Sequence, residues 1–440
     1  MTSVTRPGLA TYYTLIVTET VSLIGSRISG LAVSISVFGH TGHATPLALV
    51  AFFYTVPQLL AQGFGGALAD RFDRRALMLI ANLGFVLCSG LLLISFRSGA
   101  FQLWHLYALT FASALFAALD GPAFQASVAM LVPDHHRDRA NAIGQLTSPI
   151  AGIIAPALAG LLYATMGVTG AITVDLATFG VAILVLLAVR IPMPTLTAEG
   201  RVMAADLWRQ AFDGFRYLIA RPLLFGLTGY VSLVNFLVSG VGVLATPYVL
   251  ARTHSAASFG LVLTAFNFGA LSGAILMAAW GGTRPRIHTI MLGISLGGAF
   301  LALTGAAHST LELGVSFFLF MFCLPFVNAS AMSLFQAKIA PDVQGRTFAA
   351  MNQLAMILTP AAFLATGPLA DRVFEPAVHT LGWRAVAWIV GDRPGAGMGL
   401  MLLIAGAATM LLSLAVYARP AIRRIESILP EHTPEIPLQP

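Results

Sequence analysis

The sequence predicts an all-α polytopic membrane protein whose twelve transmembrane helices form two bundles of six. Three observations lead to this fold class. Of the 440 residues, 57% are hydrophobic and only 10% are charged, whereas soluble domains carry about 25% charged residues. Apolar runs of about 20 residues, long enough to cross a bilayer as a helix, recur along the chain. Short motifs of the first half also return in the second half.

Twelve apolar runs are the predicted membrane spans, and glycine- or proline-containing connections join most of them. The runs cover residues 11–38, 45–68, 76–96, 103–132, 141–165, 171–190, 223–250, 259–280, 289–307, 312–338, 347–370 and 396–417.

The longest interruption near the middle of the chain, residues 191–222, divides the runs into two sets of six. Apolar residues such as Phe212 and Phe215 lie among charged ones such as Arg209 and Arg216 there, which predicts an amphipathic helix on the membrane surface. We therefore expect a first bundle over 1–190, a cytoplasmic linker over 191–222, a second bundle over 223–417 and a cytoplasmic tail over 418–440. The tail is Pro-rich, and we expect it to be disordered after Arg419.

The basic residues indicate the orientation. Most of the 24 arginines and lysines fall on connections that share the side of the N-terminus, as the positive-inside rule requires of cytoplasmic segments. We expect both termini in the cytoplasm and the chain in a bacterial cell (inner) membrane. Because the arginines sit in short blocks between apolar runs, the formal net charge of +6 does not indicate binding to nucleic acid.

The two halves carry a repeated pattern. The letters FQA at 124–126 recur at 335–337, and Pro133-Asp134 and Gln145-Leu146 recur as Pro341-Asp342 and Gln353-Leu354. Such a duplication of six spans in the same orientation is typical of transporters built from parallel repeats.

The connection between the second and third runs, GGALADRFDRR at 65–75, concentrates charge in a chain that otherwise avoids it. Its pattern resembles the loop signature G-x-x-x-D-R-x-G-R-R of the major facilitator superfamily. Gly66, Asp70, Arg71, Arg74 and Arg75 match that signature, whereas Asp73 stands where glycine is usual. The resemblance implies the major facilitator fold, a transport function, a small-molecule substrate and a monomer.

The chemistry of this loop suggests a conformational gate. A glycine lets the second span approach a neighbouring helix closely. Asp70 can accept hydrogen bonds from a helix N-terminus and from an arginine, which forms a clasp on the inner face. Such a clasp holds only while the two halves are closed on the cytoplasmic side. The alternative is that the arginines only anchor the topology.

Further motifs narrow the resemblance. The stretches LVPDHHRDRANAIGQL, IAPDVQGRTFAAMNQL and GPLADRVFEP are similar to the branch that contains macrolide and siderophore exporters. AGIIAPALAG in the fifth run resembles the exporter signature G-x-x-x-G-P-x-x-G-G. Pro156 and Gly160 match it, but Ala151, Ala155 and Ala159 replace glycines. The resemblance therefore favours export.

Charged residues inside apolar runs are the candidate coupling residues. A charge near the bilayer centre costs about 2.5–3.5 kcal/mol, so it must face a partner or a water-filled cavity. Glu19 and Arg27 in the first run and Asp120 in the fourth meet this description. We expect Arg27 to pair with Asp120, and Glu19 or Asp120 to take up a proton in exchange for substrate. The alternative is a static ion pair that fixes helix packing.

Uncharged polar residues within the runs are candidates for the substrate cavity, although interhelical packing is an equally good reading for each. They are Tyr54, Gln58, Gln62, Asn235, Asn267 and Asn328. Asp175, at the start of the sixth run, is expected near the outer surface in a capping or packing role.

Motifs of other function classes are missing from the sequence. It contains no His-Glu-x-x-His zinc motif, no G-x-x-x-x-G-K-[ST] phosphate loop and no G-x-S-x-G nucleophile elbow. We expect no metal, no cofactor and no enzymatic activity. The leading interpretation is proton-coupled efflux of a small amphipathic compound such as an antibiotic or siderophore, with protons and the lipid bilayer as further partners. Uptake or lipid movement on the same scaffold, and a non-transporting membrane sensor, are the alternatives.

Overall fold

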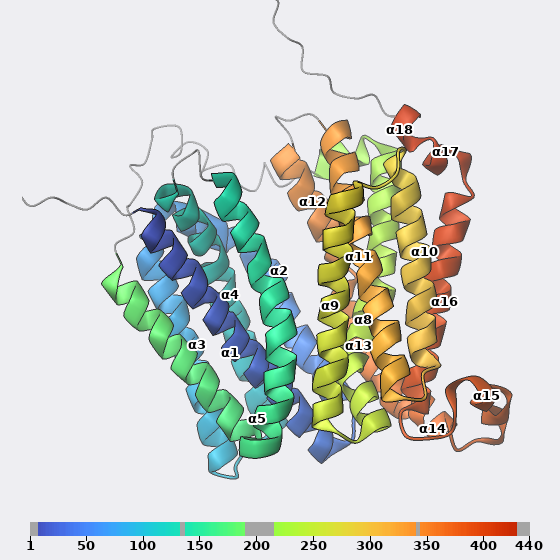
Figure 1. The fold of residues 1–440 in the computed structure, drawn as a ribbon, viewed down its shortest axis with the longest axis horizontal. Coiled ribbons are helices and arrows are strands. Elements are labelled where there is room, and N and C mark those ends of the chain that lie inside the picture. The colour runs from blue at the N-terminus through green and yellow to red at the C-terminus, as the bar shows by residue number, and fades with distance from the viewer. Residues whose placement is uncertain (1–7, 133–136, 190–214, 340–343, 429–440) are drawn as a thin grey trace, which may run out of the picture. The chain divides into compact units, whose positions relative to one another are not determined.

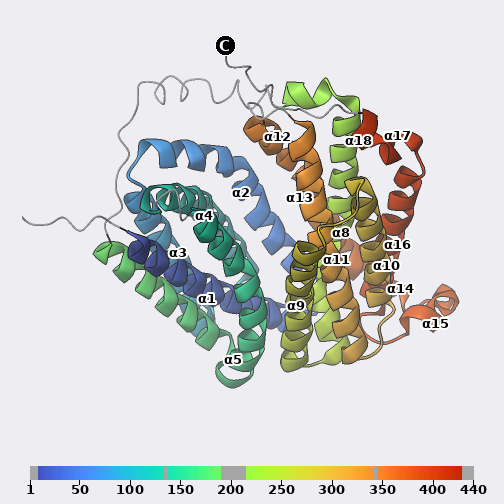
Figure 2. The ribbon, with the colours of Figure 1, turned by 45° about the horizontal axis from the view of Figure 1, so that its top comes forward.

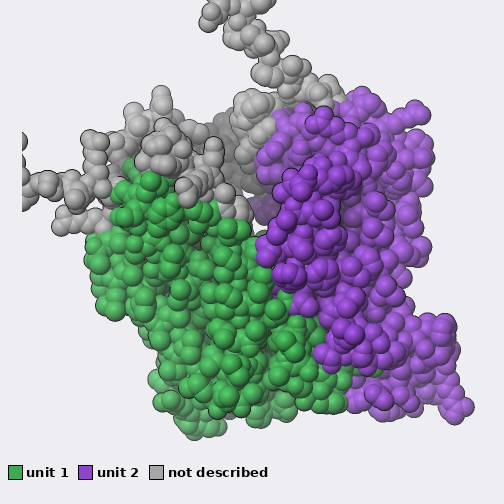
Figure 3. Space-filling model, viewed as in Figure 1, with its two compact units in different colours: residues 1–204, 243–264, 363–373 green, residues 205–242, 265–362, 374–440 purple. Residues whose placement is uncertain are grey.

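The computed structural model describes residues 8–132, 137–189, 215–339 and 344–428, and within them the regular structure is helical without strands (Figure 1). The chain divides into two compact units (Figure 3). Unit 1 comprises Met1–Ala204, Val243–Thr264 and Phe363–Val373, and unit 2 comprises Ala205–Gly242, Ala265–Ala362 and Phe374–Pro440. Two segments from the second half of the sequence thus cluster with the first half. The domain boundaries expected from the repeats stay a prediction.

Five helices make up most of unit 1. They are α1 (Leu9–Thr41), α2 (Thr45–Arg71), α3 (Arg74–Arg97), α4 (Leu103–Leu131) and α5 (Arg137–Ala188). Helix α5 is interrupted at Gly167, whose φ of 66° and ψ of −170° are not helical. Glycine adopts a positive φ without the steric cost that a Cβ would bring. The predicted fifth and sixth runs lie on either side of this residue.

The later helices are α8 (Pro222–Thr253), α9 (Ala256–Trp280), α10 (Arg286–Gly305), α11 (Thr310–Lys338), α12 (Gln344–Met356), α13 (Thr359–Leu369) and α16 (Ala396–Tyr417). A π-helical turn (Ala370–Phe374) continues α13, and the short elements α14 (Glu375–Ala377), η4 (Leu381–Ala385) and α15 (Ala387–Val390) precede α16. The buried residues Trp383 and Val390 pack against Ala396, so the connection between α13 and α16 has a small apolar core of its own.

Ten helices of the described part are long and apolar enough to cross a membrane. The stretch Leu146–Ala188 is counted once among them although it contains two predicted runs, and the shorter apolar helix Thr45–Ala61 in α2 corresponds to a further run. The helical architecture is as predicted, and these assignments are consistent with twelve spans.

The expected disorder after Arg419 is wrong for the first part of the tail. Helices α17 (Pro420–Arg423) and α18 (Ile425–Ile428) follow α16 at one end of unit 2 (Figure 2). Ile425 is fully buried, and a carboxylate oxygen of Glu426 accepts a hydrogen bond from the Ile287 amide at the start of α10, at 3.0 Å. Residues 429–440 and most of the predicted linker, including the greater part of its amphipathic helix, lie outside the described residues.

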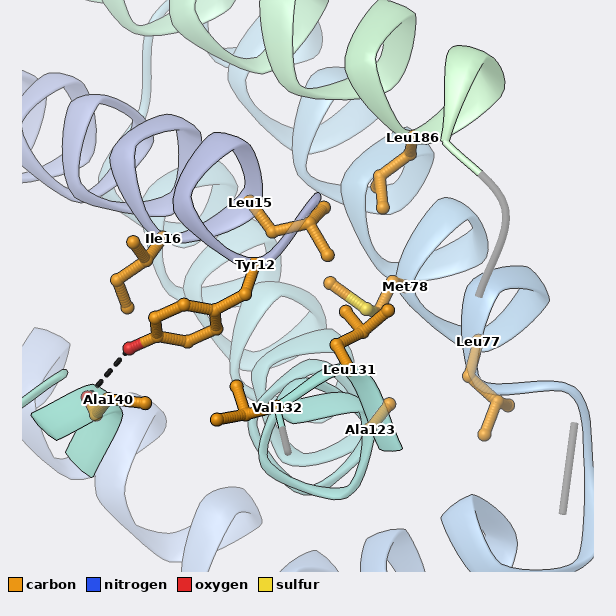
Figure 4. Close-up of a cluster of buried hydrophobic side chains, with 10 residues drawn as sticks. All are labelled: Tyr12, Leu15, Ile16, Leu77, Met78, Ala123, Leu131, Val132, Ala140 and Leu186. Atoms are coloured by element: carbon orange, nitrogen blue, oxygen red, sulfur yellow. Dashed lines mark hydrogen bonds between the residues drawn. The ribbon is translucent and has the colours of Figure 1, made fainter. Parts of the chain in front are cut away.

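A buried apolar cluster joins α1, α3, α4 and α5 within unit 1 (Figure 4). The Tyr12 ring lies in this cluster, and its hydroxyl donates a 2.7 Å hydrogen bond to the Ala140 carbonyl. The bond satisfies a polar atom that would otherwise be buried without a partner. The remaining members are Leu15, Ile16, Leu77, Met78, Ala123, Leu131, Val132 and Leu186.

In unit 2, α10 and α16 pack backbone against backbone. A Cβ at Gly298 would lie 2.7 Å from the Gly406 carbonyl oxygen, and a Cβ at Gly406 would meet the Ala302 backbone. Membrane helices approach this closely only where small residues line the contact.

Replacing Gly406 by valine should therefore separate α10 from α16. Overpacking of this kind costs about 1–3 kcal/mol, and we expect a lower apparent melting temperature of the purified protein in detergent. Gly229→Ala in α8 is the matched control, because a Cβ there meets nothing within 4 Å. Equal melting temperatures for the Gly406→Val variant and the parent protein would contradict the packing argument.

Candidate functional site

Two carboxyl groups from different helices of unit 1 interact in its interior. Asp120 lies in α4 and is only 8% exposed, and its Oδ1 atom has no hydrogen-bond partner. Glu19 in α1 is half-buried and close enough to Asp120 for its charge to act on that carboxyl group. A buried carboxylate oxygen without a donor is costly. Asp120 is therefore a buried acid with an unsatisfied oxygen and a second acid close by.

Arg27 does not pair with Asp120 as the sequence predicted. Its two terminal nitrogens donate to Ser148 in α5, one to the backbone carbonyl at 3.1 Å and one to Oγ at 2.8 Å. The guanidinium group thus joins α1 to α5 and leaves Asp120 Oδ1 unpartnered. No sequence pattern points to Ser148 as the partner, because the two residues lie 121 positions apart.

Tyr54 of α2 lies close enough to Arg27 for an electrostatic interaction, and its side chain hydrogen-bonds with that of Gln58. Tyr54 is 40% exposed, so its side chain is partly accessible from outside the unit. The side chain of Gln62, a further predicted cavity residue on α2, lies outside what the structure describes.

The start of α3 carries the charged loop identified in the sequence. Asp73 caps the helix by accepting a hydrogen bond from the Arg75 amide at 3.0 Å. Arg74 donates to the Ala126 carbonyl of α4, and Arg75 donates to the carbonyls of Leu186 and Leu187 at the end of α5. A cation at the C-terminal end of a helix satisfies free carbonyls and complements the helix dipole.

Through these hydrogen bonds, Arg74 and Arg75 connect the start of α3 to α4 and α5 in unit 1. The surroundings of Gly66 and the side chains of Asp70 and Arg71, the other matched positions of the loop, lie outside what the structure describes. The expected clasp at Asp70 therefore stays a prediction.

Asp175 has the packing role that the sequence suggested, but its position is different from the one expected. It is 3% exposed in the interior of α5 and accepts hydrogen bonds from Ser26 in α1 at 2.9 Å and Ser89 in α3 at 2.8 Å. Because Ser26 lies near the middle of α1, Asp175 is not at an outer helix end. Two hydroxyl donors satisfy this carboxylate.

The exporter-like segment of α5 makes a close backbone crossing with α9. A Cβ at Gly160 would lie 2.7 Å from the Ala256 carbonyl oxygen, and a Cβ at Gly260 would lie 2.6 Å from the Pro156 carbonyl oxygen. The contact is reciprocal, with one glycine from each helix. Pro156 and Gly160 therefore have a packing function within unit 1.

The three asparagines predicted for the cavity have different surroundings in unit 2. Asn235 donates from Nδ2 to the Ala355 carbonyl at 3.1 Å. Asn267 is half-buried, and Asn328 is exposed. No cluster of three or more metal-binding side chains occurs in the described part of the chain.

The chain is similar to known membrane transporters in both sequence and fold. The family model described as Major Facilitator Superfamily matches residues 15–363. Macrolide efflux protein A of Streptococcus pyogenes is 26% identical over 373 residues, which cover 82% of this chain and 90% of that protein. The enterobactin exporter EntS of Salmonella typhi is 30% identical over 289 residues, which cover 64% and 66% of the two chains.

Solved structures agree on the fold. A bacterial homologue of the human lysosomal transporter Spinster superposes with a TM-score of 0.65 at 16% identity, covering 92% of this chain and 96% of the other. The nucleoside transporter NupG superposes with a TM-score of 0.68 at 10% identity, covering 92% and 98%. Family and fold point to a transporter rather than an enzyme. With the family model covering most of its length, the chain belongs to the Major Facilitator Superfamily.

Proposed function

We propose that this transporter exports a small amphipathic compound, such as an antibiotic, a siderophore or another secondary metabolite, in exchange for protons. The similar proteins named as macrolide and enterobactin exporters support the direction and the class of substrate. The observation that carries the coupling mechanism is the Glu19–Asp120 pair, in which Asp120 is buried and one of its carboxylate oxygens has no donor.

The energetics of this pair favour a role in proton binding. Two carboxylates that lie close together in a low-dielectric interior repel each other when both are ionised. A proton bound by either group removes that repulsion, and it also supplies a donor for the unpartnered oxygen. Asp175 offers the contrast, since its two hydroxyl donors already stabilise the carboxylate without a proton.

The formal charges suggest how the proton couples to substrate. Arg27 contributes one positive charge to α1, the helix that also carries Glu19, and Ser148 holds it in place. With both carboxylates ionised, the formal charges of Glu19, Asp120 and Arg27 add up to one negative charge. One proton makes the set neutral. A substrate with a cationic group competes with that proton for the carboxylates, and such competition is what an exchanger requires.

The loop at 65–75 is proposed as the gate on the cytoplasmic side. Arg74 and Arg75 tie the start of α3 to the ends of α4 and α5, which gives the loop a rigid base. From that base Asp70 is proposed to engage a helix N-terminus of the other six-helix repeat while the inner face is closed. The proposed topology places both termini in the cytoplasm of a bacterial cell, with a monomer as the working unit.

Neutralising either carboxylate should uncouple transport. We expect Glu19→Gln and Asp120→Asn each to abolish proton-driven transport in vesicles, because an amide cannot bind and release the proton. Asp175→Asn is the matched control. It replaces another buried carboxylate by its amide, and because Asp175 is satisfied by hydroxyl groups we expect transport to continue.

Membrane insertion of all three variants is checked by extraction and size-exclusion chromatography. Unchanged transport in Glu19→Gln or Asp120→Asn would remove that residue from the mechanism. Loss of transport in Asp175→Asn as well would show that any buried carboxylate is required for structural reasons.

The direction of transport is testable independently of these residues. We expect a bacterial strain lacking its own pumps to accumulate less of a susceptible compound when it expresses this chain, and a protonophore should abolish the difference. Inverted vesicles should concentrate the compound when their interior is acidified. Accumulation by right-side-out vesicles instead would establish uptake or lipid movement as the function.

A further inference from the structure

A six-residue pattern of the inner loop occurs a second time in the chain. Gly66-Ala67-Leu68-Ala69-Asp70-Arg71 ends α2, and Gly367-Pro368-Leu369-Ala370-Asp371-Arg372 ends α13 and enters its π-helical turn. The two stretches differ only at their second position. On the proposed topology the first stretch lies at the inner face and the second at the outer face.

Asp371 caps the N-terminus of α2. One carboxylate oxygen accepts a hydrogen bond from the Ala44 amide at 2.8 Å, and the other accepts from the Thr45 amide at 2.8 Å and the Thr45 hydroxyl at 2.5 Å. Asp371 is 11% exposed. His43 lies 3.8 Å from the carboxylate, but it is 65% exposed, and an ion pair so open to water contributes little.

The start of α2 depends on this carboxylate because its own sequence provides no cap. The N-cap residue is Ala44, whose side chain cannot accept a hydrogen bond, and Pro46 has no amide hydrogen to offer. The free donors are therefore the amides of Ala44 and Thr45, and Asp371 accepts from both. A negative charge at this position also complements the helix dipole.

Gly367 allows the two helices to come this close. A Cβ at this residue would lie 2.6 Å from the Thr45 Cα atom and 2.9 Å from the Ala48 Cβ atom. The glycine and the aspartate of the repeated pattern thus contact the same turn of α2, one through backbone packing and one through hydrogen bonds.

We propose that Asp371 is an outer latch, the counterpart of the inner gate at Asp70. This inference deepens the proposed transport function. Helix α13 follows the predicted linker in sequence and α2 precedes it, so the latch joins elements of the two six-helix repeats. Alternating access requires these repeats to separate at the outer face in one stage of the cycle. The Asp371 hydrogen bonds hold the outer face closed and break when it opens.

A neighbouring carboxylate serves as the control. Glu375 lies four residues beyond Asp371 and also accepts hydrogen bonds from helix amides, namely those of Gly395 at 3.3 Å and Met398 at 2.8 Å. These amides start α16, and Glu375 and α16 both follow the predicted linker, so they belong to the same six-helix repeat. Glu375 therefore caps a helix without joining the two repeats.

Spin-label distance measurements on the full chain in lipid nanodiscs test the latch. Ala100→Cys, on the connection after α3, and Thr310→Cys, at the first residue of α11, place labels on exposed positions at the proposed outer face. The background carries Cys88→Ala and Cys323→Ala. The distance distribution between the labels is compared for the parent, Asp371→Ala, Thr45→Val, Glu375→Gln and Asp70→Asn, without substrate and without a proton gradient.

We expect Asp371→Ala to raise the ratio of long to short distances by at least roughly tenfold, because it removes all three hydrogen bonds to the carboxylate and one hydrogen bond to a charged group is already worth about that factor. Thr45→Val should raise it roughly fivefold, because only a hydroxyl is lost. Glu375→Gln should leave the ratio unchanged. Asp70→Asn should lower it, because weakening the inner gate favours the state in which the outer face is closed.

The latch proposal would be overturned by an unchanged ratio of long to short distances in Asp371→Ala. It would also be overturned if Glu375→Gln raised that ratio as much as Asp371→Ala. If Asp371→Ala does not yield a monodisperse protein, Thr45→Val decides the question in the same way. The distance measurement requires no transported compound, so its result can be interpreted even if the export proposal fails. A negative result here likewise leaves the Glu19 and Asp120 transport experiments valid.

Discussion

The structure depends on one constraint: a polar group in an apolar medium must find its partner inside the protein. Three charged side chains of the described residues meet it with backbone atoms and small hydroxyls rather than with opposite charges. Arg75 donates to carbonyls at the end of α5, Asp175 accepts from serine hydroxyls, and Asp371 accepts from amides at the start of α2. Each interaction fixes the end or the face of a helix as well as satisfying a charge.

Asp120 stands out because it does not follow this rule. Its neighbouring acid is another carboxyl group, and one of its oxygens has no donor. Arg27, the cation that the sequence paired with Asp120, is held by Ser148 instead. A buried carboxylate oxygen without a donor contributes nothing to stability. A site that binds and releases a proton, by contrast, requires a carboxyl group without permanent hydrogen-bond donors, because such donors would stabilise the ionised form and hinder protonation.

The sequence predicted the positions of the helices better than the side-chain contacts between them. Run length and composition determine where a membrane helix lies, and Gly167 marked the break between two runs that α5 joins. The pairing of Arg27 was wrong because a helix that is apolar on all sides carries no pattern that shows which neighbour each face meets. Asp371 was part of a recognised motif, but its donors are backbone amides, and these leave no mark in the sequence.

In our proposal, the repeated Gly-x-Leu-Ala-Asp-Arg pattern gives the inner and outer ends of the transporter the same kind of helix cap. An aspartate at the end of one helix can cap the start of another only when the two helix ends meet, so the hydrogen bonds report closure at that face and contribute to it. On the proposed mechanism the pattern supplies one gate on each repeat. Gates of similar chemistry would leave neither closed state strongly preferred, so that the binding of a proton or a substrate would be sufficient to decide between them.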